Sequence, residues 1–188
     1  GVDISSEAIA SASERGIKAY QVDVSASRLP FENNFFDFIF CGELIEHLFD
    51  PDFLLEEIHR TLKRWGTLII TTPNLGAWYN RLSLLFGFQP SIAASLRNPE
   101  VGKPFRNAFT MKYPRGGSEV HIRHFTKRAL VELLKIKGFQ IEDVKGAFFG
   151  KQPKESAAIL KVMYMFDKLF ANFPSLASWI GEATLLNS

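Results

Sequence analysis

Cysteine is nearly absent from this sequence: Cys41 is the one cysteine among 188 residues, so no disulfide can form within the chain. No stretch reaches the roughly 18 apolar residues of a membrane-spanning helix, and no signal-peptide pattern is found. The formal net charge is only +2, which argues against nucleic acid held by bulk electrostatics. Together these absences predict a cytoplasmic protein in a reducing compartment that does not bind nucleic acid.

The sequence does contain a regular alternation of short apolar runs and amphipathic stretches. With 46% hydrophobic residues, the chain can bury one sizeable core, so residues 1–188 are expected to form a single domain. Such alternation with short links predicts an α/β fold, with a Rossmann-like, mostly parallel sheet and helices on both faces. The predicted elements are strands at 1–3, 17–22, 36–41 and 67–72, a helix capped by Ser5 or Ser6 and ending at Gly16, and a helix starting at Asp50-Pro51.

The alternation breaks after Asn74. Residues 75–120 contain aromatics, glycines, prolines and arginines without a clean repeat, and about 45 residues is too long for an ordinary connection. We therefore expect an inserted lid or acceptor-binding segment there. Beyond it, the sequence predicts a helix at 127–137 capped by Thr126, a strand at 139–145, an apolar helix at 155–173 and a last helix or strand within 176–186.

Two apolar segments leave peripheral membrane contact open. One is the stripe of large side chains between Trp78 and Phe86, and the other is the apolar helix predicted at 155–173, which carries lysines. Such stripes usually form the interior of a lid, but they also suit a bilayer surface. The second possibility would place the protein at a membrane surface and would suit a lipid-linked acceptor.

Acidic residues follow three of the predicted strands. Asp3 ends the first, Asp23 ends the second, and the apolar run at 36–41 leads into Gly-Glu-Leu-Ile-Glu-His. Open α/β sheets bind their ligands at the carboxyl ends of the strands, where an aspartate can accept hydrogen bonds from a ribose diol. Asp3 suits that role, and Asp23 suits the amine of an adenine ring. The alternative is that both aspartates only cap turns.

Cys41 lies inside the apolar run of a predicted strand. No basic neighbour would lower its pKa, so we expect a small buried hydrophobic residue rather than a catalytic thiol.

Four segments together carry a family resemblance: GVDIS, DVSASRLPFENNFFDFIFCGELIEHLFDP, GTLIITTPN and HIRHFTKRALVELLKIKGFQIEDVKG. In order and spacing they resemble the class I S-adenosylmethionine-dependent methyltransferases, best the group that acts on small molecules, quinone precursors and glycans. The resemblance implies a transferase that binds S-adenosylmethionine, releases S-adenosylhomocysteine and takes a small-molecule, glycan-like or lipid-linked acceptor. It assigns ribose binding to Asp3, adenine contacts to Ile4, Asp23 and Val24, and further cofactor contacts to Cys41, Gly42 and Glu43.

One feature of that family has no counterpart here. In its members a first strand and a glycine-rich loop precede the segment that matches GVDIS, whereas this sequence begins there. The resemblance therefore implies a domain that lacks one edge of its cofactor site. The expectation is methyl transfer, and the alternative is a truncated or degenerate Rossmann-like module that only binds or interacts.

A base is useful when the methyl acceptor is a hydroxyl, because the enzyme otherwise mainly aligns the nucleophile with an already activated methyl group. The candidates are His47, Glu46 and His121, with His124 close by. Packing beside the cofactor is the alternative for His47. Anchoring of the lid is the alternative for the other two histidines.

Glu43, Glu46 and His47 form an E-x-x-E-H cluster that would share one face of a helical turn. It resembles the metal-binding cluster of polyprenyl-catechol O-methyltransferases, and oxygen-rich ligation would suit Mg²⁺. The same acid-histidine pair is also found in family members without metal. We therefore expect a structural or cofactor-adjacent role and no metal ligands.

Overall fold

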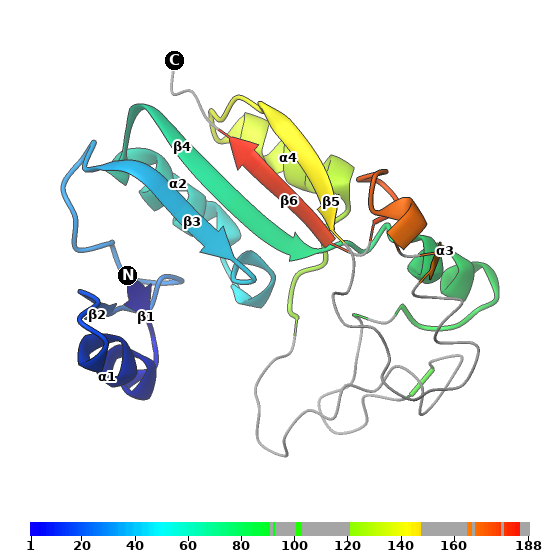
Figure 1. Ribbon diagram of the computed structural model, residues 1–188, viewed down its shortest axis with the longest axis horizontal. Helices are drawn as coiled ribbons and strands as arrows, with labels where there is room; N and C mark the ends of the chain where they lie inside the picture. Colours follow the sequence, from blue (N-terminus) through cyan, green and yellow to red (C-terminus); the bar gives the residue numbers. More distant parts are fainter. Residues whose placement is uncertain are drawn as a thin grey trace.

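The computed structural model describes residues 1–90, 92, 101–102, 121–147, 165–166, 168–177 and 179–184. Six strands and five helical segments that carry labels lie in these ranges (Figure 1), and residues 165–166 and 168–170 are also helical. The strands are β1 (Val2–Asp3), β2 (Tyr20–Gln21), β3 (Phe36–Gly42), β4 (Leu62–Pro73), β5 (Asp143–Ala147) and β6 (Trp179–Thr184). The helices are α1 (Ser6–Glu14), the 3₁₀ turn η1 (Ile45–His47), α2 (Pro51–Thr61), α3 (Trp78–Leu85) and α4 (Lys127–Ile136).

The strands form a small sheet and a large sheet. β1 and β2 pair in parallel, and the large sheet has the order β3-β4-β6-β5. Within it β3 and β4 are parallel, while β6 runs antiparallel to both of its neighbours. Figure 1 shows β1, α1 and β2 as a separate group beside β3. The chain is thus α/β with parallel strands and helices, as the sequence predicts.

The helix starts follow the predicted caps. A short polar side chain accepts a hydrogen bond from a backbone N–H in the first turn, which the helix itself leaves without a partner. The three caps are Ser5 to the Ala8 N–H (3.2 Å), Asp50 to the Phe53 N–H (3.0 Å) and Thr126 to the Ala129 N–H (3.2 Å). Gly16 and Gly138 end their helices with φ of 75° and 88°, a region that favours glycine.

Strand boundaries differ more from the prediction than helix boundaries do. β4 begins at Leu62 rather than at residue 67, because the chain pairs with β3 at once on leaving α2. The pairing is irregular there, and Trp65 adopts a φ of 67°. β2 is shorter than the predicted 17–22, and β5 lies about four residues later than 139–145.

The regions beyond β4 are described only in part. The predicted lid at 75–120 begins with α3, and most of the rest of it lies outside the described residues. The same holds for most of the apolar helix predicted at 155–173. The last predicted element, within 176–186, is a strand, β6. Among the helices described, none combines the length and the apolar character needed to cross a membrane.

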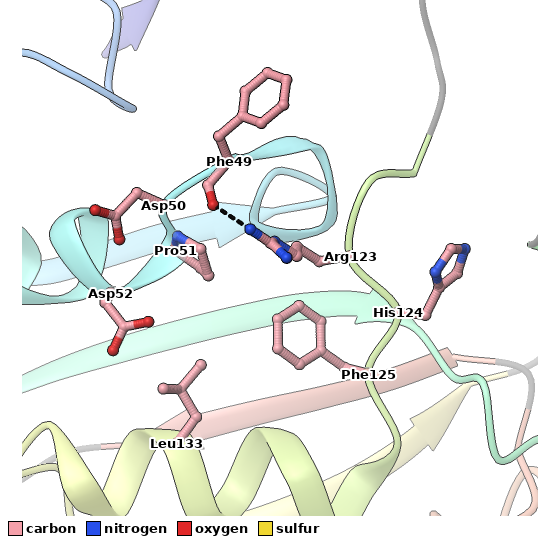
Figure 2. Close-up of a pocket in the computed structure, with 8 residues that line it drawn as sticks. All are labelled: Phe49, Asp50, Pro51, Asp52, Arg123, His124, Phe125 and Leu133. Carbon is pink, nitrogen blue, oxygen red and sulfur yellow. Dashed lines mark hydrogen bonds between the residues drawn. The ribbon is translucent and has the colours of Figure 1, made fainter. Parts of the chain in front are cut away.

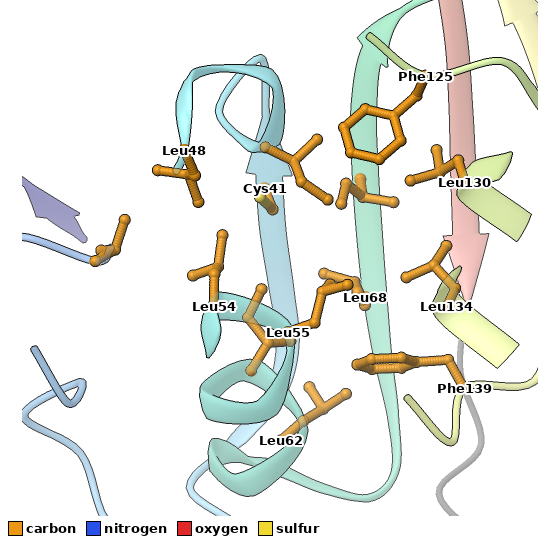
Figure 3. Packing of buried hydrophobic residues seen from close by; sticks show 14 of the residues in the cluster. Cys41, Leu48, Leu54, Leu55, Leu62, Leu68, Phe125, Leu130, Leu134 and Phe139 are labelled. Atoms are coloured by element: carbon orange, nitrogen blue, oxygen red, sulfur yellow. The ribbon is translucent and has the colours of Figure 1, made fainter. Parts of the chain in front are cut away.

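One core joins the large sheet to α2 and α4. Figure 3 shows side chains of the two helices packed against the same face of β3 and β4, with Leu55, Leu68 and Leu134 fully buried. Cys41 belongs to this core at 4% exposure, so its predicted place as a small buried residue is confirmed. In the described chain, Phe38 and Phe40 on β3 are exposed.

The polar side chains of α2 around His59 are exposed to solvent only in part. Glu57 is buried, and it accepts hydrogen bonds from Arg60 Nη2 (2.7 Å) and from the Leu29 backbone N–H (2.8 Å). His59 packs its ring edge-on against Phe139, with centroids 5.6 Å apart. The loop before β3 is fastened to α2 by Glu57, a long-range contact that helical periodicity does not reveal.

Candidate functional site

Asp3 and Asp23 both lie at strand ends, as predicted, and both also cap turns. Asp3 Oδ1 accepts from the Ser5 N–H at 2.8 Å, and Asp23 Oδ1 accepts from the Ser25 N–H at 2.9 Å. Both carboxylates are exposed. Because a carboxylate offers about four lone-pair sites, one turn bond leaves capacity for a ligand. Capping is therefore a role that both have, and ligand binding is compatible with it.

The two apolar residues assigned to the adenine differ in their surroundings. Ile4 is 64% exposed, and its backbone carbonyl accepts from Gln21 Nε2 at 3.1 Å. Val24 is 8% exposed and belongs to the core. An exposed isoleucine just after a strand end offers an apolar surface to a flat ring, while the valine is fixed by packing.

A second group of candidates follows β3, at the point where the strand ends at Gly42. Glu43 adopts a φ of 52°, and its N–H donates to the Thr71 carbonyl at 3.0 Å. Thr71 Oγ1 donates to Glu43 Oε1 at 2.8 Å. Although the Glu43 residue is exposed, desolvation by the surrounding chain raises its pKa to about 7. The bond from Thr71 opposes the rise, and the charge of Glu46 and a side-chain hydrogen bond with it add to it. Burial, with both glutamates near, raises the pKa of Cys41 to about 12, which excludes a thiolate at neutral pH.

Glu46 is the most deeply buried of the candidates, at 1% exposure within η1. Thr72 Oγ1 donates to its Oε2 at 3.0 Å, while Oε1 has no hydrogen-bond partner among the described residues. The Glu46 backbone carbonyl accepts from the N–H groups of Ile122 and Arg123, at 2.8 and 2.9 Å. This double contact brings the segment after the predicted lid onto the 3₁₀ turn.

The same contact brings two histidines together. The rings of His47 and His121 lie with centroids 4.9 Å apart, and His47 Nε2 is 3.9 Å from Glu46 Oε1. Burial lowers the pKa of His121 to about 4, with the neighbouring His47 and His124 as further causes. His121 is thus neutral at physiological pH and able to accept a proton. The three predicted catalytic residues form one cluster, whereas His124 lies farther away, 6.5 Å from His121 between centroids.

Thr71 and Thr72 were missed as site residues by the sequence interpretation. Each holds one glutamate of the cluster, and both lie at the carboxyl end of β4. The signal available was two hydroxyl side chains that end an otherwise apolar strand and point to opposite sides of it.

A hollow of about 500 Å³ adjoins the segment that carries the histidines (Figure 2). On one side Arg123 Nη2 donates to the Phe49 carbonyl at 2.6 Å, and Phe125 and Leu133 line the other side. The remaining lining residues are Asp50, Pro51, Asp52 and His124. None of the residues predicted to bind the cofactor lines it, so this hollow is separate from the strand-end groups.

The two groups of candidates are held by different parts of the fold. Asp3, Ile4 and Asp23 belong to the small sheet and the turns around it, while Glu43 and Glu46 follow the large sheet. The two sheets share no strand pairing in the described chain. The loop fastened by Glu57 and Leu29 connects them.

Part of this chain is similar to known proteins. Residues 1–70 match the family described as "Methyltransferase domain". The uncharacterized protein MJ1123 of Methanocaldococcus jannaschii is 40% identical over 70 residues, which are 37% of this chain and 33% of that protein. The match therefore spans about a third of the length of the curated relative.

Solved structures extend the likeness over the whole chain at the level of the fold. A S-adenosylmethionine-dependent methyltransferase from Methanosarcina mazei aligns with a TM-score of 0.60 at 19% identity, covering 100% of this chain and 82% of that one. One from Thermotoga maritima aligns with a TM-score of 0.58 at 18% identity, covering 99% and 72%. Residues 1–70 thus resemble a methyltransferase domain, and the chain as a whole has the fold of the S-adenosylmethionine-dependent methyltransferases with which it aligns.

Proposed function

We propose that this protein transfers the methyl group of S-adenosylmethionine to an oxygen, nitrogen or carbon atom of a small-molecule, lipid-linked or glycan-like acceptor. The observation that carries the proposal is the placement of acids at three strand ends. Asp3 ends β1, Asp23 follows β2 and Glu43 follows β3. Ligands of open α/β sheets bind at that end of the strands.

The small-sheet residues are assigned to the nucleoside. Asp3 would accept hydrogen bonds from the ribose diol, and Asp23 would accept from the adenine amine. Ile4, which is exposed, would cover one face of the adenine ring, and Val24, which is fixed by packing in the core, would contact the ring as well. Exposed carboxylates that already stand on short turns need little reorganisation to bind such donors.

The groups after β3 are assigned to the reacting end. Cys41 and Gly42 would form the wall beside the cofactor, and the glutamates would favour its positive sulfonium electrostatically. In the transfer, the acceptor atom forms a bond to the methyl carbon while the carbon–sulfur bond breaks and its electron pair stays on sulfur. A hydroxyl acceptor gives its proton to His121, which is neutral at physiological pH. Glu46 and His47 would orient that base.

Cofactor binding by the Asp3→Ala variant tests the proposal. Calorimetry with S-adenosylmethionine and S-adenosylhomocysteine should show a loss of about 1–3 kcal/mol, as expected for lost hydrogen bonds to a charged group. Asp3→Asn separates the two roles of the residue, because the amide still accepts from the Ser5 N–H but carries no charge. Asp37→Ala is the matched control, since Asp37 is an exposed aspartate on β3 paired with Lys63.

Two outcomes would contradict the assignment. If Asp3→Ala binds as tightly as the wild type, ribose binding by Asp3 is wrong. If the wild-type chain binds neither compound, a module without catalytic function becomes the better account of this chain.

We further propose that residues 75–120 bind the acceptor as a lid. In support, α3 begins this segment next to the end of β4. Its side chains Leu82 and Leu85 are 47% and 74% exposed, and Phe86, which follows the helix, is 70% exposed. Exposed apolar side chains at this density suit an apolar acceptor or a bilayer surface. Leu85→Glu should abolish sedimentation with anionic lipid vesicles if the surface is a bilayer, whereas Ser83→Glu on the same helix should not.

A further inference from the structure

Glu46 presents a problem that the fold does not solve. Its carboxylate is buried at 1% exposure, but only Oε2 has a hydrogen-bond partner, Thr72. Oε1 has none among the described residues. A buried charged oxygen without a partner carries a desolvation cost of several kcal/mol, so native structures usually provide one. Such an exception in a well-packed interior points to a group that belongs there.

Two imidazoles stand around that oxygen. The first is the imidazole of His47, whose Nε2 is 3.9 Å from Oε1, and the second is the imidazole of His121, which lies next to the His47 ring. One ligand atom from each of Glu46, His47 and His121 can be chosen so that all three lie within 4.8 Å of one another. The ligand atoms around a tetrahedral ion with bonds of about 2.0–2.1 Å are about 3.3 Å apart. Binding of an ion would draw the three ligand atoms from this separation to that spacing.

We propose that Glu46, His47 and His121 bind a divalent cation of the zinc type, with water in the open coordination position. Two imidazole nitrogens and one carboxylate oxygen are a common ligand set of zinc sites that keep an open position. Mg²⁺ prefers an octahedral shell of oxygens and is a poor match for two imidazoles. The site therefore differs from an oxygen-rich magnesium site in its metal and in its inclusion of a ligand from beyond the predicted lid.

The surrounding contacts have the form of an outer shell. Thr72 holds one oxygen of the carboxylate and thereby aims the other toward the imidazoles. The Glu46 carbonyl fixes the backbone next to His121 through the N–H groups of Ile122 and Arg123. Hydrogen bonds of this kind orient metal ligands and raise affinity in known sites. They hold the cluster together before any ion binds.

The chemical consequence rests on the proposed function. An acceptor hydroxyl that replaced the water on such an ion would lose its proton more readily, because the cation stabilises the oxyanion. With the ion bound, His121 would be a ligand in place of the base, so the proton would pass to solvent. The oxygen would then form its bond to the methyl carbon of S-adenosylmethionine while the carbon–sulfur bond breaks.

Cobalt binding tests the site without cofactor or acceptor. The 188-residue chain, stripped with EDTA and dialysed, is titrated with Co²⁺ while visible absorption is recorded, and with Zn²⁺ in a calorimeter. We expect one ion per chain, d–d absorption typical of nitrogen and oxygen ligands, and no displacement by Mg²⁺ in large excess. His121→Ala and Glu46→Gln should each weaken Co²⁺ binding by at least about tenfold, a loss seen even for outer-shell changes.

The controls keep the result decisive. His59, on α2, packs against Phe139 and is not part of the cluster, so His59→Ala should leave Co²⁺ affinity unchanged. Far-ultraviolet circular dichroism shows whether each variant is folded. If Glu46→Gln is unfolded, the His121→Ala variant decides the test, because His121 is only half-buried. Wild type without an absorption change, or His121→Ala with wild-type affinity, overturns the proposal. Either result leaves methyl transfer untouched, because neither measurement contains the cofactor.

Discussion

Glu46 and Glu57 are both buried glutamates, at 1% and 6% exposure, in two regions that resolve the cost of burial differently. Both carboxylate oxygens of Glu57 accept hydrogen bonds. Arg60 donates through Nε at 2.8 Å and through Nη2 at 2.7 Å, and the Leu29 N–H donates at 2.8 Å. Among the described residues, Thr72 donates to one oxygen of the Glu46 carboxylate, and the other oxygen has no hydrogen-bond partner. Burial alone therefore does not separate a structural carboxylate from a functional one, but the completeness of its hydrogen bonding does.

The charges around the two buried glutamates differ in the same sense as their hydrogen bonds. The Arg60 guanidinium lowers the pKa of Glu57 to about 2, so this region favours the ionised acid. Next to Glu46, desolvation and the second carboxylate raise the pKa of Glu43 to about 7. One region is a finished ion pair that fastens a loop to α2. The other collects negative charge that a proton or a cation would relieve.

Glu57→Gln should lower the stability of the fold more than any other substitution considered for the two glutamates. The amide carries no charge and cannot accept from both Arg60 and the Leu29 N–H as the carboxylate does. We expect the free energy of unfolding to fall by about 2–3 kcal/mol, the range for hydrogen bonds to charged groups. Urea unfolding followed by circular dichroism measures this loss.

Glu56→Gln is the matched control on the same helix. Glu56 is exposed and pairs with Lys137 at 2.8 Å. Exposed pairs are worth at most about 1 kcal/mol, so its loss should be small. Equal losses for the two variants would mean that Glu57 is no more important than a surface acid.

The pH dependence of stability should have opposite signs in the two regions. Because the pKa of Glu57 falls from 4.5 to about 2, its contribution is fully present above pH 4.5 and is lost as the pH falls toward 2. Because the pKa of Glu43 rises from 4.5 to about 7, the folded state binds the extra proton, and its contribution is lost as the pH rises from 4.5 to 7.

Urea unfolding of metal-free protein at a series of pH values checks both signs. The stability difference between wild type and Glu57→Gln should shrink on acidification below pH 4.5. The free energy of unfolding of Glu43→Gln should rise relative to that of wild type as the pH increases from 4.5 to 7. A flat difference in either window would contradict the corresponding pKa shift.

The elements set by local chemistry could be predicted from the sequence. Caps such as Asp50 and Thr126 act within one helical turn, and the apolar run of β3 is continuous, so short-range patterns locate them. β4 could not be delimited in this way, because its first residues are in a strand only through pairing with β3. β6 lies antiparallel between β4 and β5, an order that comes from tertiary packing.

The candidate site divides along the same line. Asp3 and Asp23 were found because a strand end and a turn are local features. The juxtaposition of Glu46 with His121 depends on backbone contacts between distant segments, and no spacing in the sequence encodes it. The burial of Glu57 likewise could not be predicted from helical periodicity, because its partner Leu29 lies in a distant loop.

Glu46→Gln should have the smallest effect on stability, in contrast to Glu57→Gln. The amide oxygen can still accept from Thr72, and the substitution removes a buried charge that the described structure leaves half satisfied. Replacing such a charge by a neutral group of the same size is often neutral or stabilising, so we expect a change within about 1 kcal/mol of zero. Thr72→Val provides the contrast, because it removes the hydrogen bond that the Glu46 carboxylate accepts from Thr72 and should cost about 1–3 kcal/mol. If Glu46→Gln instead costs as much as Glu57→Gln, the two buried glutamates are alike, and Glu46 is a structural residue of the fold.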